Sequence, residues 1–219
     1  MLDTRRQLRY RLGVPSSSVI PLYRLGFALL TIAAIVTQMV SLASTGVLDP
    51  VHYLTFFTII SNLIATTVFL VGAARWRSER SATWDLVRGA AVVYMTVTGV
   101  VFAVLLSGTN VDTAIPWVNS VVHELMPIVV IADWLVDPPR ARLTLRQGAV
   151  WLAYPLVWIV YELIRGSIVG KYHYPFLNPA NGGYPIVLLY CVAILVFMLV
   201  VCSVVVWLGN VRSSSSSAR

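Results

Sequence analysis

The pair His123 and Glu124 lies inside an otherwise apolar run, PWVNSVVHELMPIVVIADWL. Ionisable side chains are costly within a membrane, so they usually face the protein interior or a water-filled cavity and mark functional sites. An unperturbed imidazole has a pKa of about 6.5, which suits proton transfer near neutral pH. His123 is therefore the first candidate for acid–base chemistry in this chain.

A threonine hydroxyl could be the group that His123 activates. Thr55 and Thr58 lie three residues apart in the run HYLTFFTIISN. A hydroxyl is a weak nucleophile until a base removes its proton. The structural alternative is that each threonine bonds the backbone of its own helix, as is common in membrane helices. Spacing alone does not separate Thr55 from Thr58 as a nucleophile.

Four other polar side chains could assist such a pair. Glu162 or Glu124 could orient the imidazole, and Asn62 or Asn119 could donate a hydrogen bond to a developing oxyanion. The structural alternatives are that the asparagines join helices by hydrogen bonds and that Glu162 pairs with Arg165 on its own helix.

Thr55, His123 and Glu162 are predicted to lie in the same half of the membrane. At a rise of about 1.5 Å per residue, Thr55 lies about 5 Å from one membrane face and the other two lie about 10 Å from it. In a continuous helix Thr55 and Asn62 share one face, and so do Asn119 and His123. The sequence therefore predicts a polar site near one membrane face.

A zinc site is an alternative use of the same region. His52, His123 and His173 are all predicted on this side, with Glu162 nearby, and three histidines with a carboxylate could hold a catalytic zinc ion. The histidines lie on separate segments without a recognised zinc-binding spacing. We therefore predict no metal and no other cofactor.

Composition defines the class of protein. Of the 219 residues, 58% are hydrophobic and 11% are charged, and the mean hydropathy is +0.80. Soluble domains carry about 25% charged residues, and a membrane-spanning helix needs about 20 apolar residues. The sequence predicts an all-α polytopic membrane protein, a six-helix bundle with spans near 20–43, 52–74, 86–107, 116–136, 148–169 and 184–208.

The segments outside the bundle are short. Residues 1–19 are predicted as a cytoplasmic arm, 20–208 as the transmembrane domain, and 209–219 as a disordered cytoplasmic tail that includes a run of serines. No separate soluble domain is expected.

Arginines are distributed unevenly between the two predicted sides. Only Arg165 and Lys171 fall on the histidine-containing side. The arginines of the other side are Arg5, Arg6, Arg9, Arg11, Arg24, Arg75, Arg77, Arg80, Arg88, Arg140, Arg142, Arg146, Arg212 and Arg219. The positive-inside rule then makes both termini cytoplasmic. We interpret these arginines as topology signals and contacts for anionic lipids, not as a nucleic-acid surface. Asp133 and Trp134 are predicted to anchor the inner boundary.

Three short motifs carry a resemblance to a known family. HYLTF begins the second span, NSVVH lies in the fourth with Pro127 after it, and YPFL lies in the last outer loop. In these motifs the chain resembles the androgen-induced and androgen-dependent TFPI-regulating family of six-helix membrane proteins, and it resembles bacterial relatives along most of its length. After LTF the chain continues FTIISN, which the animal members do not share.

The resemblance implies a function and a site. The animal members are threonine hydrolases of fatty acid esters of hydroxy fatty acids. By this resemblance Thr55 is the nucleophile, His123 is the base, and Tyr174, Pro175 and Phe176 belong to the substrate pocket. It also implies a multi-pass protein of the bacterial cytoplasmic membrane that acts on membrane lipids. The sequence does not indicate an oligomeric state.

Three hypotheses follow. The first is an intramembrane lipid-ester hydrolase with a threonine nucleophile and a histidine base. The second is a membrane protein without enzymatic activity that binds or transports a small amphipathic molecule. The third, a zinc-dependent lipid hydrolase, needs the three histidines to meet.

Overall fold

The computed structural model describes residues 19–108 and 115–217, and in these ranges the regular structure is helical, with no strand. Six helical stretches are long and apolar enough to cross a membrane. The predicted all-α, six-helix class is therefore confirmed, and the chain is an integral multi-pass membrane protein.

The elements are α2 (Val19–Ser44), α3 (Pro50–Leu54), α4 (Phe57–Ala74), α5 (Ala82–Val101), η1 (Phe102–Leu106), α6 (Pro116–Ser120), η2 (Val121–Leu125), α7 (Met126–Val136), α8 (Leu145–Gly148), η3 (Ala149–Leu152), α9 (Ala153–Val169), η4 (Pro175–Leu177), η5 (Pro179–Asn181) and α10 (Gly183–Ser217).

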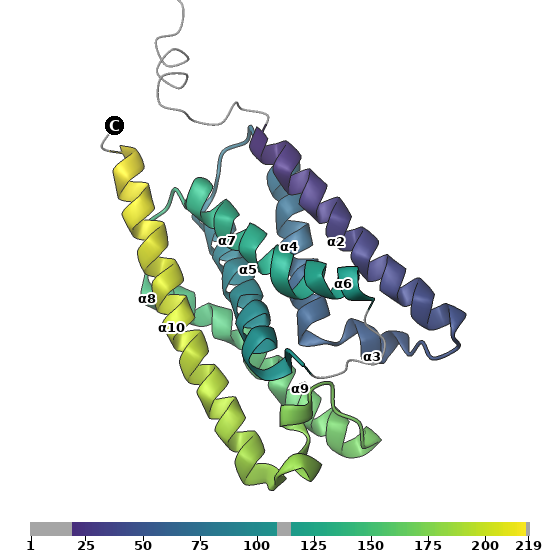
Figure 1. Ribbon diagram of the computed structural model, residues 1–219. Helices are drawn as coiled ribbons and strands as arrows, with labels where there is room; N and C mark the ends of the chain where they lie inside the picture. The colour runs from purple at the N-terminus through teal and green to yellow at the C-terminus, as the bar shows by residue number, and fades with distance from the viewer. Residues whose placement is uncertain (1–18, 109–114, 218–219) are drawn as a thin grey trace, which may run out of the picture.

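The long helices pack around one main apolar core. α2 packs on α4, α4 on α5, and α5 on both α7 and α10 (Figure 1). The core includes Phe69, Met95, Met126 and Trp134, whose side chains are fully buried. The two described chain ends lie at the same end of the bundle (Figure 1). We call that end the arginine side, after Arg24, Arg80 and Arg88, and the opposite end the histidine side, after His52, His123 and His173.

The second predicted helix is broken, which corrects the expectation of one continuous span. α3 ends at Leu54, and Phe56 has an extended backbone with ψ near 135°. The Trp158 indole N–H donates to the carbonyl of Thr55 at 2.9 Å, and the Thr55 hydroxyl donates to the carbonyl of Val51 at 2.6 Å. The indole satisfies the Thr55 carbonyl, which a continuous helix would pair internally, whereas the Val51 carbonyl also keeps its helical bond from the Thr55 backbone N–H at 3.1 Å.

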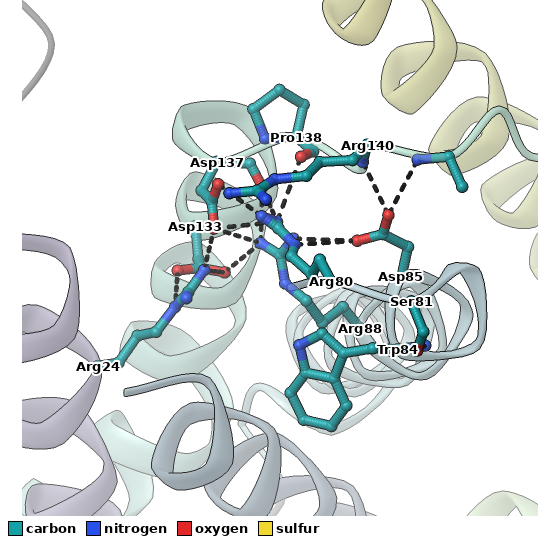
Figure 2. Close-up of polar contacts among 11 residues, drawn as sticks. Arg24, Arg80, Ser81, Trp84, Asp85, Arg88, Asp133, Asp137, Pro138 and Arg140 are labelled. Atoms are coloured by element: carbon teal, nitrogen blue, oxygen red, sulfur yellow. Dashed lines mark hydrogen bonds and ion pairs between the residues drawn. The ribbon is translucent and has the colours of Figure 1, made fainter. Parts of the chain in front are cut away.

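On the arginine side, Asp133 is buried and was wrongly predicted as a boundary anchor. Its carboxylate accepts from Arg24 Nε at 2.7 Å and from Arg88 Nη2 at 2.9 Å (Figure 2). Arg24 and Arg88 are themselves only 3% and 2% exposed. They are therefore parts of the protein interior and not only surface topology signals.

The same network continues toward the loop that follows α7 (Figure 2). Arg80 donates to Asp137 at 2.8 Å and to Asp85 at 3.2 Å. The second oxygen of Asp85 accepts from the backbone N–H of Arg140 at 2.7 Å. Since a buried charge needs a partner, these contacts fix the arginine-side ends of α2, α5 and α7 together.

The predicted terminal segments are the arm at residues 1–19 and the tail at residues 209–219. α10 continues as a helix through Ser217, beyond the predicted start of a disordered tail at residue 209. Extending an existing helix is much easier than starting a new one. The predicted arm, residues 1–19, lies outside the described residues except for Val19, which begins α2.

Candidate functional site

Thr58 and His123 meet near the histidine side of the bundle. Thr58 is the second residue of α4, and its Oγ1 lies 3.3 Å from His123 Nε2. His123 Nδ1 lies 3.2 Å from the carbonyl oxygen of Asn119, which can only accept a hydrogen bond. In the neutral imidazole Nδ1 therefore carries the proton, and Nε2 is left to accept the Thr58 hydroxyl proton. This is the arrangement of a general base beside its nucleophile.

Tyr174 completes the hydrogen bonds around Thr58. The Tyr174 hydroxyl lies 3.2 Å from Thr58 Oγ1 and accepts from the Thr58 backbone N–H at 3.3 Å. Burial raises the pKa of Tyr174 to about 12, so this hydroxyl keeps its proton at neutral pH. It can therefore donate to Thr58 Oγ1, while the Thr58 hydroxyl donates to His123.

Two π-helical stretches, η1 and η2, bring the residues around His123 together. His123 lies in η2, and its ring stacks on that of Phe102 in η1 with centroids 4.3 Å apart. Gly99 permits the close approach, since a Cβ there would lie 2.9 Å from Pro127 Cβ. Single turns of π-helix within α-helices occur frequently at functional sites.

Thr55 forms a second contact of the same type, with His173. Its Oγ1 lies 3.2 Å from His173 Nε2, and His173 Nδ1 bonds the carboxylate of the fully buried Glu162. However, His173 Nε2 also lies 2.9 Å from the carbonyl of His52. The Glu162 carboxylate and the His52 carbonyl both accept only, so each ring nitrogen donates to its partner, and Nε2 has no free lone pair to remove a proton from Thr55. The Thr55 proton is itself donated to the carbonyl of Val51.

The Glu162–His173 contact also holds the chain in place. Glu162 also accepts the backbone N–H of His173 at 2.6 Å, so one carboxylate holds both the ring and the backbone of the loop between α9 and η4. The predicted alternative partner of Glu162, Arg165, donates instead to the carbonyl of Lys171 at 2.9 Å. The next element, η4, packs against the bundle, and its Leu177 is 1% exposed.

The three histidines of the zinc alternative lie in two places. The rings of His52 and His173 stack with centroids 4.3 Å apart, while His123 pairs with Thr58. Within the described residues, no group of three or more His, Cys, Asp and Glu side chains could hold a metal ion. Burial, with a smaller contribution from His173, lowers the pKa of His52 to about 4, so His52 is neutral at pH 7.

The predicted supporting residues have other environments. Asn62 is fully buried and donates both amide hydrogens to the carbonyls of Thr58 and Val122, at 2.9 and 3.0 Å. It acts as an interhelical link, which was the structural alternative, and has no hydrogen left for an oxyanion. Asn119 contributes its backbone carbonyl to His123, and Glu124 is exposed.

An apolar cavity of about 270 Å³ adjoins Thr58, the hydroxyl partner of His123. Thr58, Tyr174 and Phe176 lie in its wall, whereas the carbonyl of the third predicted pocket residue, Pro175, accepts from the Asn181 side chain at 2.8 Å. The other lining residues are Phe57, Val97, Thr98, Val101, Leu106, Leu152, Pro155, Leu156, Trp158, Ile159, Leu177, Leu188, Cys191, Val192, Ile194, Leu195 and Met198.

The sequence interpretation joined Thr55 to His123, whereas the hydrogen bonds join Thr58 to His123 and Thr55 to His173. It also did not recognise the indole of Trp158 as the donor that ends α3. The sequence did show that either threonine could be the partner of His123, since Thr55 and Thr58 lie three residues apart. The break between α3 and α4 separates them and turns the two hydroxyls to different histidines.

Comparison with known proteins adds no relative: no family model, no curated protein and no solved structure matches the chain. The fold and the site define an integral, all-α membrane protein in which a buried threonine, in contact with a partly buried histidine, borders an apolar cavity.

Proposed function

We propose that this protein is an intramembrane lipid-ester hydrolase in which Thr58 is the nucleophile and His123 the general base. One observation supports this most directly. The Thr58 hydroxyl lies in the wall of the apolar cavity and within hydrogen-bond distance of a histidine nitrogen that is free to accept its proton. The resemblance to threonine hydrolases points to the same chemistry.

The reaction would proceed in two steps. Thr58 Oγ1 attacks the ester carbonyl carbon while His123 Nε2 takes the hydroxyl proton. The tetrahedral intermediate collapses, the C–O bond to the alcohol breaks, and the alcohol leaves with that proton. Water then attacks the acyl-threonine, His123 takes a proton from the water and returns it to Thr58 Oγ1, and the carboxylic acid is released.

The surroundings of Thr58 favour the negative charge of the intermediate. Thr58 is the second residue of α4, so the oxyanion forms at a helix N-terminus, whose partial positive charge stabilises anions. The Tyr174 hydroxyl, 3.2 Å from Thr58 Oγ1, is a second donor at this place. Donors fixed in advance around a developing oxyanion are often the largest contribution to catalysis.

Thr58 is preferred to Thr55 as the nucleophile because the histidine nitrogen that faces Thr58 carries no proton, whereas the one that faces Thr55 does. The base nearest Thr55, His173 Nε2, already carries a proton that it donates to a carbonyl. We further propose that the arginine side faces the cytoplasm and that the protein lies in a bacterial cytoplasmic membrane, as the positive-inside rule and the resemblance indicate.

Hydrolysis of a palmitate ester of hydroxystearate by the purified protein tests the proposal. Thr58→Val and His123→Gln should lower kcat at least about 100-fold, since a nucleophile and its base are each worth this much or more. Thr55→Val, the matched control with the same loss of a hydroxyl, should retain kcat within about threefold. Thermal unfolding would confirm that each variant is folded. Loss in Thr55→Val but not in Thr58→Val would overturn the assignment.

A binding protein without enzymatic activity is the second candidate, and the same cavity supports it. It would bind the ester without cleaving it, and binding would survive Thr58→Val. Absence of hydrolysis by the folded wild type, across several lipid esters, would favour this second function.

A further inference from the structure

The cavity beside Thr58 reaches the outer, lipid-facing surface of the bundle. Three of its lining residues are also well exposed: Leu156 is 48%, Leu188 is 64% and Val192 is 49% exposed. Leu156 lies on α9, and the other two lie on α10. The cavity is therefore accessible from the side, between two membrane-spanning helices.

The chemistry of this opening specifies what can enter it. All three residues at the opening are aliphatic, and they belong to helices that cross the membrane. The medium at this position is then lipid hydrocarbon, not water. Most of the cavity wall is aliphatic or aromatic, and an apolar cavity of this kind does not hold ordered water well. A hydrocarbon chain from the bilayer matches both the opening and the wall.

The cavity extends along the bundle from the histidine side toward the membrane interior. Its α10 residues run from Leu188 to Met198, ten residues that span about 15 Å. Cys191 packs against the cluster that contains Tyr174, which contacts Thr58. Met198 lies seven residues further along α10, about 10 Å deeper.

Met198 forms the closed end of this space. It lines the cavity, is only 3% exposed, and belongs to the main apolar core together with Val201 and Cys202. No comparable side opening exists at this depth among the described lining residues, since the exposed ones lie nearer Thr58. The length of a bound chain is then limited by the Met198 side chain.

We propose that the cavity binds one acyl chain of a membrane lipid, admitted between α9 and α10, and that Met198 determines how long a chain it accepts. The placement of the chain's carbonyl end at Thr58 rests on the proposed hydrolase function. The binding of the chain and the role of Met198 do not.

Competition between octanoate and laurate for the protein in detergent, followed by native mass spectrometry, tests this. Each buried methylene group contributes roughly fourfold in affinity, so the wild type should prefer laurate. Met198→Trp fills the deep end and should shift the laurate-to-octanoate ratio toward octanoate by at least about tenfold. Leu199→Trp is the matched control: it is adjacent, 46% exposed and outside the cavity wall, and should leave the ratio within about twofold.

Each outcome decides the proposal. A wild type that binds neither fatty acid overturns the acyl site, whatever its hydrolytic activity. An unchanged ratio in Met198→Trp, or an equal shift in Leu199→Trp, overturns the role of Met198. If Met198→Trp does not fold, Met198→Ala lengthens the cavity and should raise the stearate-to-laurate ratio about fourfold or more, and an unchanged ratio there overturns the same point. Failure of ester hydrolysis, with binding and its length dependence intact, would count against the proposed function alone.

Discussion

The two threonine–histidine contacts differ in which imidazole nitrogen carries a proton. At His123, the carbonyl of Asn119 holds a proton on Nδ1 and leaves Nε2 as an acceptor for Thr58. At His173, the carbonyl of His52 holds a proton on Nε2, the nitrogen that faces Thr55. Similar distances therefore support different chemistry, a base in the first contact and a structural donor in the second.

The first residue-scale prediction concerns Tyr174. Tyr174→Phe removes the hydroxyl that donates to Thr58 Oγ1 and should lower kcat for ester hydrolysis about 10- to 100-fold, the usual effect of removing a group that positions or stabilises a reacting atom. Tyr190→Phe makes the same change on α10, where the ring contacts Phe176, and should keep kcat within about twofold. Equal losses in both variants would contradict the role given to Tyr174.

The second residue-scale prediction separates Glu162 from catalysis. Glu162→Leu leaves His173 without its buried partner and should lower the free energy of unfolding by about 3–5 kcal/mol. Glu124→Leu, at an exposed site, should change it by less than about 0.5 kcal/mol. Equilibrium unfolding in detergent measures both. If Glu162→Gln remains folded but loses its kcat at unchanged stability, Glu162 has a catalytic role after all.

At the scale of elements, the break between α3 and α4 decides which threonine reaches His123. Hydropathy predicted the spans to within a few residues, because membrane helices need a minimum apolar length. It did not predict the break, because the Trp158 indole that stabilises it is about a hundred residues away in the chain. The π-helical turns were not predicted either; in the structure the rings of Phe102 in η1 and His123 in η2 stack on each other.

Removing the Trp158 indole N–H tests this account of the break. Trp158→Phe leaves the Thr55 carbonyl without its donor and should lower the free energy of unfolding by about 1–3 kcal/mol, the cost of a buried unpaired polar group. Trp207→Phe, on the lipid-facing surface of α10 at 62% exposed, should be nearly neutral. Comparable effects of the two substitutions would show that the indole bond does not stabilise the break.

At the scale of the whole molecule, the arginine side and the histidine side have different tasks. The arginine side contains an ion network of three arginines and three aspartates: Arg24, Arg80, Arg88, Asp85, Asp133 and Asp137 (Figure 2). Their formal charges cancel. From the sequence, these arginines were indistinguishable from the exposed Arg75 and Arg77, because only the folded chain brings the aspartates of α5 and α7 to them.

Asp133 should therefore be critical for stability but not for chemistry. Asp133→Leu leaves Arg24 and Arg88 buried without this partner and should lower the free energy of unfolding by about 3–5 kcal/mol. Glu79→Leu removes an equal charge from an exposed position on the same side and should cost less than about 0.5 kcal/mol. A near-neutral Asp133→Leu would mean that the network does not hold the bundle together.

The sideways opening between α9 and α10 changes what counts as substrate concentration. An ester that enters through this opening reaches the site by diffusion in the two dimensions of the membrane, so the mole fraction of ester in the bilayer governs the rate. If the total amount of ester is kept constant and inert phospholipid is added to the membrane, turnover should fall in proportion to the mole fraction of ester. Adding buffer at a fixed membrane composition should leave turnover per protein unchanged.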